Sequence, residues 1–343
     1  MKHLLAILCL FVGLTCGAAM ADTIRRIGGT IENGTLAKMT RDGVRLTSST
    51  KDVTVPVNEI LTYNFTREPN ALKDVRSAIE SQQYEKVPTI IEAMPMMSEP
   101  RPEVTADLEF YRALAAVRLA ISGVLDQKET LEAGKAMIEF LKAHPDNYHF
   151  YEANEAVGNL LASMNNPQAP RYYDIVASAP WNDYKVRALV LKGRAEQMLG
   201  KHQSAVQQFD AALKLPPNNP NAEEQLKYAQ VYRAASMAEI GQAQQGLIAI
   251  KSTIDSLDTA DQELLARAYN ALGTCYLKLN QPADARFAYL HVDLLFSSQA
   301  DAHAETLHQL ISLWKIDKKP ERAKAAAETL QELYPGSRWS RVK

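Results

Sequence analysis

The sequence predicts a mostly α-helical protein: an α-solenoid of about seven helical hairpins, preceded by a small antiparallel β-barrel or sheet. Two observations carry this prediction. A pattern of small, aromatic and proline residues recurs along the chain with a period of about forty residues, which is typical of helical repeat arrays. Residues 22–66 are instead rich in Thr, Val, Ile and Gly, with turn signals at short intervals. We therefore expect a signal segment at 1–21, a β-module at 22–66 and a helical array at 67–343.

The N-terminus has the pattern of a secretory signal peptide. Lys2 and His3 precede an apolar run from Leu4 to Leu14, and an Ala-x-Ala site ends at Ala21. This pattern predicts cleavage after Ala21 and export to the periplasm or cell envelope. The apolar run is shorter than the roughly 20 residues that cross a bilayer, so no stable membrane insertion is expected after cleavage. An uncleaved membrane anchor is the alternative.

The β-module is predicted from two turns and the segments between them. Asn33-Gly34 and Arg41-Asp42-Gly43 are tight-turn signals, because Asn and Gly tolerate positive φ. Short β-prone segments flank these turns and predict four or five antiparallel strands. Those segments are Leu36 to Met39, Val44 to Thr47, Val53 to Val57 and Ile60 to Phe65. The string from Gly29 to Leu46, followed by Val55 to Ile60, resembles a small SH3-like or Sm-like barrel; a two-hairpin sheet packed on the first repeat would give nearly the same pattern.

The clearest helical repeat lies at 189–217. Gly193 and Ala205 are small enough for two helices to approach closely, and Leu189 and Phe209 fill the space beside them. Pro217 ends the second helix, because it lacks an N–H group and clashes with the preceding turn. This segment resembles a tetratricopeptide repeat (TPR).

Other copies of the repeat keep the same spacing, although some of their positions do not match the pattern. The later copies are marked by Tyr269, Leu272, Gly273, Tyr276, Ala285 and Tyr289, then by Leu307, Leu310, Trp314, Ala323, Ala327, Leu330 and Pro335, with a weaker unit at Ala234, Gly241, Gly246 and Ile250. Upstream hairpins are expected at 71–94, 111–145 and 151–180. All these residues are interpreted as packing residues that specify the fold rather than a binding site.

Together, the signal segment, the β-module and the degenerate repeats resemble secreted TPR proteins of bacteria of planctomycete-like type. That resemblance implies an architecture and carries no known activity. The ending from Leu333 to Trp339 is also similar to the Tyr-Pro-x-Ser turns of periplasmic envelope-assembly proteins. A role in the envelope is what this similarity implies.

Composition and motifs exclude several function classes. The formal net charge is −2, and no run of Lys or Arg forms a basic patch, so we expect no nucleic-acid partner. No nucleotide-binding glycine loop or nucleophile motif is present, so no cofactor and no catalytic residue is assigned. His303 and His308 are five residues apart, on different helix faces, which argues against a metal site. Cys275, the only cysteine left in a mature chain, is expected to be a buried packing residue.

A partner-binding surface is predicted from repeat geometry. In TPR superhelices the first helix of each pair lines the concave side, and its non-consensus positions face the ligand. Counting from the assigned registers gives the candidate residues Glu109, Arg112, Glu155, Arg187, Arg194, Tyr228, Asn270, Thr274 and His308. The mixture of charges of both signs with an aromatic side chain suits an extended polar peptide.

These observations predict a non-catalytic scaffold, exported to the periplasm or envelope, that binds a protein or peptide partner in the concave groove. Arg187 and Arg194 are expected to pair with carboxylates of that partner. The alternative is a protein that binds glycan or envelope polymer through the β-module, with the repeats as a spacer. Exposed aromatic rings would favour it, but Tyr63 and Phe65 alternate on one strand face and are expected to point into the core. The sequence leaves the oligomeric state open.

Overall fold

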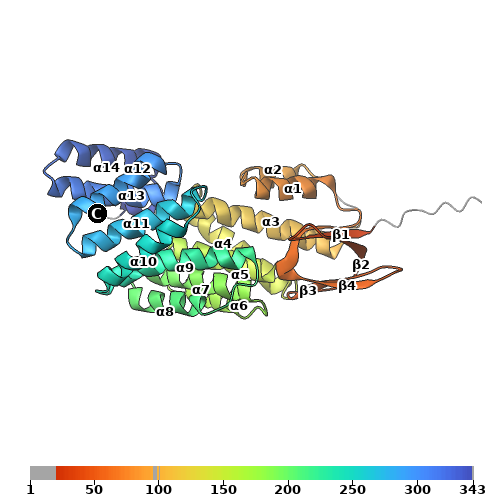
Figure 1. Cartoon of the computed structure of the whole chain (residues 1–343). Coiled ribbons are helices and arrows are strands. Elements are labelled where there is room, and N and C mark those ends of the chain that lie inside the picture. Colours follow the sequence, from red (N-terminus) through yellow and green to blue (C-terminus); the bar gives the residue numbers. More distant parts are fainter. Residues whose placement is uncertain (1–20, 96–98, 100, 342–343) are drawn as a thin grey trace, which may run out of the picture.

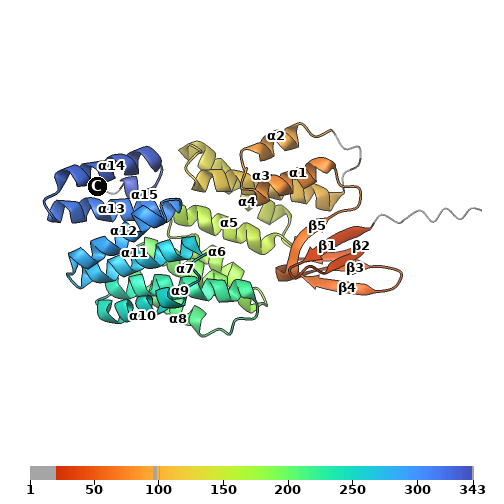
Figure 2. The same ribbon diagram turned by 45° about the horizontal axis from the view of Figure 1, so that its top comes forward.

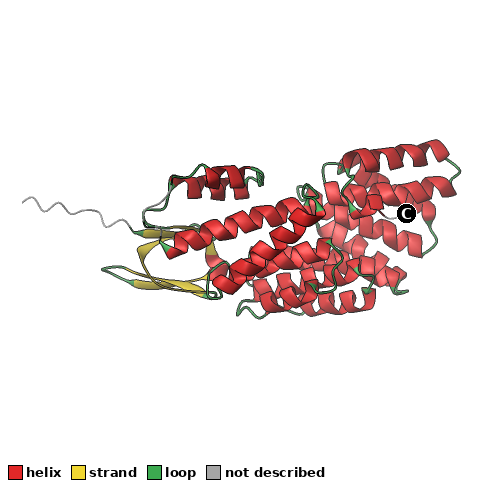
Figure 3. Ribbon diagram, turned by 180° about the vertical axis from the view of Figure 1, so that it is seen from behind, coloured by secondary structure: helices red, strands yellow, loops and turns green. Residues whose placement is uncertain are grey.

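The computed structural model describes residues 21–95, 99 and 101–341, in which a small sheet is followed by helices (Figures 1 and 3). The predicted signal peptide therefore falls outside the described residues, except for Ala21. The strands are β1 (Asp22–Arg26), β2 (Ile31–Thr40), β3 (Gly43–Thr47), β4 (Asp52–Pro56) and β5 (Ile60–Asn64), with a short 3-10 helix at Val57–Glu59. No described helix combines the length and apolarity needed to span a bilayer.

The five strands form one antiparallel sheet in the order β4-β3-β2-β1-β5. Its two outer strands do not pair with each other, so the sheet is open rather than closed into a barrel. The turn predicted at Arg41-Asp42 is confirmed between β2 and β3. The turn predicted at Asn33-Gly34 is wrong, because both residues lie inside β2 and pair with β1.

Close packing between strands, rather than a turn, explains the glycine at position 34. An added Cβ there would lie 2.7 Å from the carbonyl oxygen of Thr47 on the neighbouring strand. Only glycine allows this close approach, at the point where β2 passes from its partner β1 to its partner β3. The connection between β1 and β2 instead uses Gly28 and Gly29, whose φ angles are +100° and +88°.

In the described part of the chain, the helices α1 to α14 follow the sheet and pair into seven successive hairpins, as predicted. They are α1 (Asn70–Glu80), α2 (Lys86–Glu92), α3 (Pro102–Ile121), α4 (Gln127–Ala143), α5 (Phe150–Ser163), α6 (Ala169–Ala177), α7 (Asn182–Met198), α8 (His202–Leu213), α9 (Pro220–Glu239), α10 (Ala243–Ser256), α11 (Gln262–Lys278), α12 (Pro282–Leu295), α13 (Ala300–Ile316) and α14 (Pro320–Leu333). A short helix, α15 (Arg338–Arg341), packs against α13 and α14.

The predicted small-residue packing is present in three hairpins. An added Cβ at Gly193 would lie 2.5 Å from the ring of Phe209, and one at Gly273 would lie 2.6 Å from the ring of Tyr289. Gly158 has the same relation to Tyr173. In each hairpin an aromatic ring on the second helix therefore sits directly on a glycine of the first, which sets the spacing between the two helices.

Each hairpin also turns in the same way. Its first helix ends at one residue with positive φ, and the amide of the following residue bonds back to a carbonyl five residues earlier, as from Lys201 to Glu196 at 2.8 Å. This is the Schellman pattern that satisfies free carbonyls at a helix end. At the ends of the seven first helices, the residue with positive φ is Gln82, Gly123, Asn165, Gly200, Gly241, Asn280 or Lys318 in turn.

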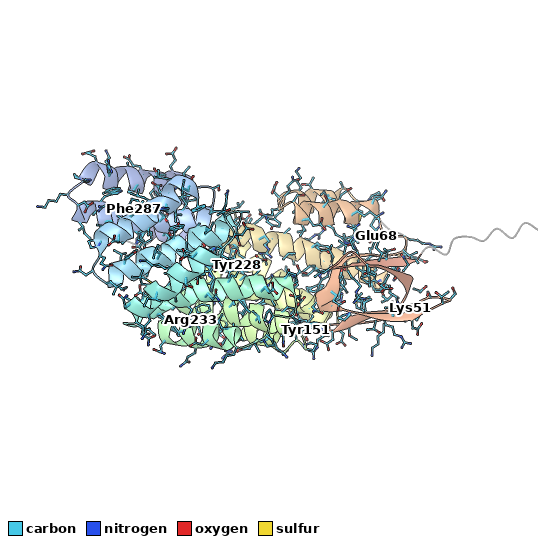
Figure 4. All side chains as sticks on the ribbon, viewed as in Figure 1. Lys51, Glu68, Tyr151, Tyr228, Arg233 and Phe287 are labelled. Atoms are coloured by element: carbon cyan, nitrogen blue, oxygen red, sulfur yellow. The ribbon has the colours of Figure 1, made fainter. Side chains whose placement is uncertain are left out.

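The sheet and the first helices share one hydrophobic core. Tyr63 and Phe65, both buried as predicted, pack in the same cluster as Leu72 of α1 and Val104 of α3. A polar contact also links the sheet to the third hairpin: the hydroxyl of Tyr151 on α5 donates to Asp42 at 2.8 Å (Figure 4). The sheet therefore forms a fixed end of the array, as Figure 2 shows.

Candidate functional site

A cavity of about 1280 Å³ lies among the later hairpins and the C-terminal segment. Its walls come mainly from the first helices of four successive hairpins, α7, α9, α11 and α13. The ends of α3, α5 and α7 with the turns that follow them, the start of α4 and the segment after α14 contribute most of the rest. The principal polar and aromatic lining residues are Arg194, Gln197, Tyr232, Arg267, Asn270, Thr274, Glu305, Gln309, Arg338 and Trp339.

The two ends of the cavity wall meet at a pair of glycines. An added Cβ at Gly123, in the turn after α3, would lie 3.6 Å from Cα of Gly336 in the segment after α14. The C-terminal segment thus returns to a turn that belongs to the second hairpin. The turn after α3 and the segment after α14 therefore meet at the cavity wall.

Three of the predicted partner-binding residues line the cavity. Arg194 comes from α7, and Asn270 and Thr274 from α11. Asn270 is buried; its amide donates to the carbonyl of Ala302 at 2.8 Å and its oxygen accepts from Thr306 at 2.6 Å. Asn270 therefore ties α11 to α13, and Arg194 and Thr274 remain more accessible to a ligand.

Two further predicted residues contact the cavity wall from behind. Tyr228 stacks on Tyr232 with ring centroids 6.0 Å apart, and Figure 4 shows Tyr228 near the middle of the array. The His308 ring lies 5.3 Å from that of Trp339, and burial lowers the pKa of His308. Both residues support lining side chains.

The remaining predicted residues do not line the cavity. Glu155 and Arg187 form an ion pair at 2.6 Å between α5 and α7. Arg112 is exposed on α3, and its neighbour Glu109 contacts His144 at 2.8 Å. The structure therefore brings together Arg194 and the predicted residues of α9, α11 and α13, but leaves Arg187 and the predicted residues of α3 and α5 apart from them.

Sequence reasoning missed the charged residues near the predicted Arg194. Arg194 itself donates to the hydroxyl of Tyr232 at 2.5 Å, and its guanidinium lies 4.4 Å from the centre of that ring. Arg267 donates to Asp301 at 3.0 Å. Arg267 could have been found, because it precedes Asn270 by three residues and Thr274 by seven and so lies on the same helix face.

Guanidinium, amide, hydroxyl and aromatic groups converge in the cavity, and such groups can form hydrogen bonds and stacking contacts with a polar ligand. Within residues 21–95, 99 and 101–341, no group of three or more His, Cys, Asp or Glu side chains could hold a metal ion. Cys275 is fully buried, as predicted, and burial raises the pKa of its thiol to about 12, which keeps it protonated and unreactive.

Comparisons with known proteins agree with this architecture. The tetratricopeptide repeat family matches residues 186–219 and 266–295. No curated protein matches the chain in sequence. Among solved structures, a tetratricopeptide repeat protein from Parabacteroides merdae is 14% identical, with a TM-score of 0.53 over 77% of this chain and 92% of that one.

A second similar structure is NprR in complex with its cognate peptide NprX, which is 16% identical, with a TM-score of 0.53 over 77% of each chain. The apo form of the quorum sensor NprR from B. thuringiensis is 9% identical, with a TM-score of 0.51 over 77% of this chain and 86% of that one. At these identities the likeness concerns the fold alone. The helical array of this chain is thus a TPR-like solenoid.

Proposed function

We propose that this protein is a non-catalytic scaffold that binds an extended segment of a partner protein in the cavity formed by α7, α9, α11 and α13. The observation that carries this proposal is the cavity itself: about 1280 Å³, lined by polar and aromatic side chains from four successive first helices. An extended peptide would find hydrogen-bond donors and acceptors along its whole length there. The NprR complex, which has a similar fold, holds a peptide and supports this choice.

The glycan-binding alternative has less support. It needs exposed aromatic rings on the β-module, but the side chains of Tyr63 and Phe65 are 1% and 3% exposed. Their rings belong to the core shared with α1 and α3 and cannot stack on a sugar.

We also propose that the protein acts after export to the periplasm or envelope, with Asp22 as the first residue of the mature chain. The Ala-x-Ala site directly before β1 supports this. The mass of the protein purified from its native cells tests it: a chain starting at Asp22 supports export, and a chain retaining residues 1–20 contradicts cleavage after Ala21.

Affinity capture with a filled cavity tests the binding role. Gln309 lines the cavity and has no side-chain hydrogen bond or ion pair among the described residues, so Gln309→Trp fills space with little loss of contacts. The matched control, Arg112→Trp, adds the same ring on the exposed face of α3. We expect one defined protein to be captured by the wild-type chain and the control and lost with Gln309→Trp. Equal capture by all three would contradict binding in the cavity.

The same capture tests the two arginines predicted from the sequence. Because Arg187 already pairs with Glu155 outside the cavity, we expect Arg194→Ala to weaken capture and Arg187→Ala to change it little. An equal loss for both would place the binding surface outside the cavity, across α5 and α7.

A further inference from the structure

The cavity contains an unusual concentration of ionised groups from distant parts of the chain. Arg194 on α7, Arg267 on α11 and Arg338 on α15 all line it. Two carboxylates of α13 are close to them: Glu305 lines the cavity as well, and Asp301 stands one helical turn earlier. These five groups lie near enough to interact electrostatically, although they are up to 144 residues apart in sequence (338 − 194).

Asp301 is the acceptor that joins two of the arginines. One of its oxygens lies 3.0 Å from Arg267 and 3.6 Å from Arg194. The second of these ion pairs joins the first helix of the fourth hairpin to the first helix of the seventh. Burial would raise the pKa of Asp301, but Arg267 and Arg194 outweigh it and hold the pKa below its usual value. Asp301 is therefore an ionised carboxylate held between two guanidinium groups.

Although packed atoms partly surround it, this carboxylate keeps contact with solvent. The side chain of Asp301 is 55% exposed, while those of Arg194 and Arg267 are 26% and 14% exposed. A water-accessible ion pair contributes little to stability, so its partners can be exchanged at small cost. The two arginines are held in place by other contacts: Arg194 by Tyr232 and Arg267 by Glu263 at 2.9 Å. Removing Asp301 would therefore leave both guanidinium groups where they are.

The third arginine has no such acceptor. Among the described residues, Arg338 has no carboxylate within 4.0 Å, and its guanidinium lies 4.4 Å from the centre of the Trp339 ring. Burial lowers the pKa of Arg338 and raises that of Glu305. Arg338 is thus a guanidinium group in the cavity lining without an ion-paired carboxylate of its own.

We propose that the cavity binds an acidic segment of the partner, and that Asp301 is an intramolecular competitor that occupies the place of one of the partner's carboxylates. This inference rests on the proposed peptide-binding function. A carboxylate entering the cavity forms charge-assisted hydrogen bonds with Arg194 and Arg267 and displaces Asp301, which remains in water at the first turn of α13. Asp301 then sets the affinity and rejects segments without negative charge.

Fluorescence anisotropy tests this with a defined probe: a labelled ten-residue peptide of Gly and Ser with three central glutamates, beside the same peptide with glutamines. We expect Asp301→Asn to bind the glutamate peptide about tenfold more tightly than the wild type, the equivalent of about 1.4 kcal/mol. Binding of the glutamine peptide should not change. Adding Arg194→Gln or Arg267→Gln to Asp301→Asn should abolish the gain.

Asp284→Asn is the matched control, because Asp284 is likewise an exposed acid in the first turn of a repeat helix, α12, and lies outside the cavity lining. It should leave both affinities unchanged, and circular dichroism should show all variants folded. The inference is overturned if Asp301→Asn gains no affinity, gains it equally for both peptides, or fails to bind the glutamate peptide at all. In each case the scaffold proposal still stands if Gln309→Trp alone abolishes partner capture, so the two failures are distinguishable.

Discussion

The two ends of this molecule use charged side chains in opposite ways. At the sheet end, Arg76 of α1 lies 2.8 Å from Glu68 and 3.0 Å from Asp107 of α3, with all three side chains 7% exposed or less. At the cavity end, Asp301 pairs with two arginines in a site open to water. The same kind of ion pair is closed and structural in one place and exchangeable in the other. Both ends contain salt bridges, so the exposure of the paired side chains is what distinguishes the buried Arg76 network from the candidate site.

The largest effect should come from breaking the buried network. Arg76→Met leaves Glu68 and Asp107 buried without their cation, so we expect the free energy of unfolding to fall by about 3 kcal/mol or more. Urea unfolding followed by circular dichroism measures this. Arg233→Met is the control, because the Arg233–Asp210 pair is 30% and 39% exposed and should cost less than about 1 kcal/mol. Equal losses of unfolding free energy for Arg76→Met and Arg233→Met would contradict the distinction between buried and exposed ion pairs.

A smaller effect is expected from the repeat packing common to both regions. Gly193→Ala places a Cβ 2.5 Å from the Phe209 ring, and we expect a loss of about 1–3 kcal/mol from overpacking. Adding Phe209→Leu should recover part of that loss, which a double-mutant cycle measures. Gly134→Ala in α4 is the control, because its Cβ meets only the end of the Leu160 side chain at 3.1 Å. It should be neutral or slightly stabilising. An additive cycle would contradict the assigned packing.

The stability of the sheet end should also depend on pH, through His149. Burial alone would lower the pKa of His149, but the carboxylates of Asp107 and Glu152, which lie 3.5 and 3.1 Å from its ring nitrogens, outweigh it, so the pKa is raised. Arg76 of α1 shares Asp107 and limits this effect. Because the folded-state pKa exceeds the unfolded value of about 6.5, protonation stabilises the fold below that pH, and the gain is lost as pH rises through the folded pKa. We expect urea midpoints to fall from pH 6 to pH 8 more in the wild type than in His149→Gln. Parallel pH profiles would rule out this role for His149.

The smallest effect on stability belongs to the cavity. Asp301→Asn removes two partly exposed ion pairs and should change the free energy of unfolding by less than about 1 kcal/mol, although it changes peptide affinity. Thermal unfolding beside Asp284→Asn checks this. A loss of unfolding free energy as large as that of Arg76→Met would show that Asp301 is a structural residue. The ion pairs at the two ends would then have the same role.

Local sequence predicted the features that local chemistry decides. The glycine and aromatic pairs of the hairpins, the inward direction of Tyr63 and Phe65 and the burial of Cys275 follow from size and periodicity. The turn at Asn33-Gly34 was wrong because a turn signal and a close strand approach both select glycine. The sequence pattern alone did not separate these two causes.

The site could be predicted only in part. Arg194 and Thr274 were found because repeat register fixes which helix face is concave. Asp301 and Arg338 were missed because their role depends on curvature accumulated over several hairpins. No spacing along the chain relates Arg194 to Asp301, and the return of the C-terminal segment to the turn at Gly123 is a tertiary contact.

The central claim, that the cavity holds a partner segment, is tested most directly by site-specific photo-crosslinking in native cells. A benzoylphenylalanine at position 309 lies in the cavity, and one at position 287 replaces Phe287, which is 68% exposed on α12 and outside the cavity lining (Figure 4). We expect one partner protein to be crosslinked from position 309, through an acidic stretch of its sequence, and not from position 287. Crosslinking of a partner from position 287 alone would contradict it.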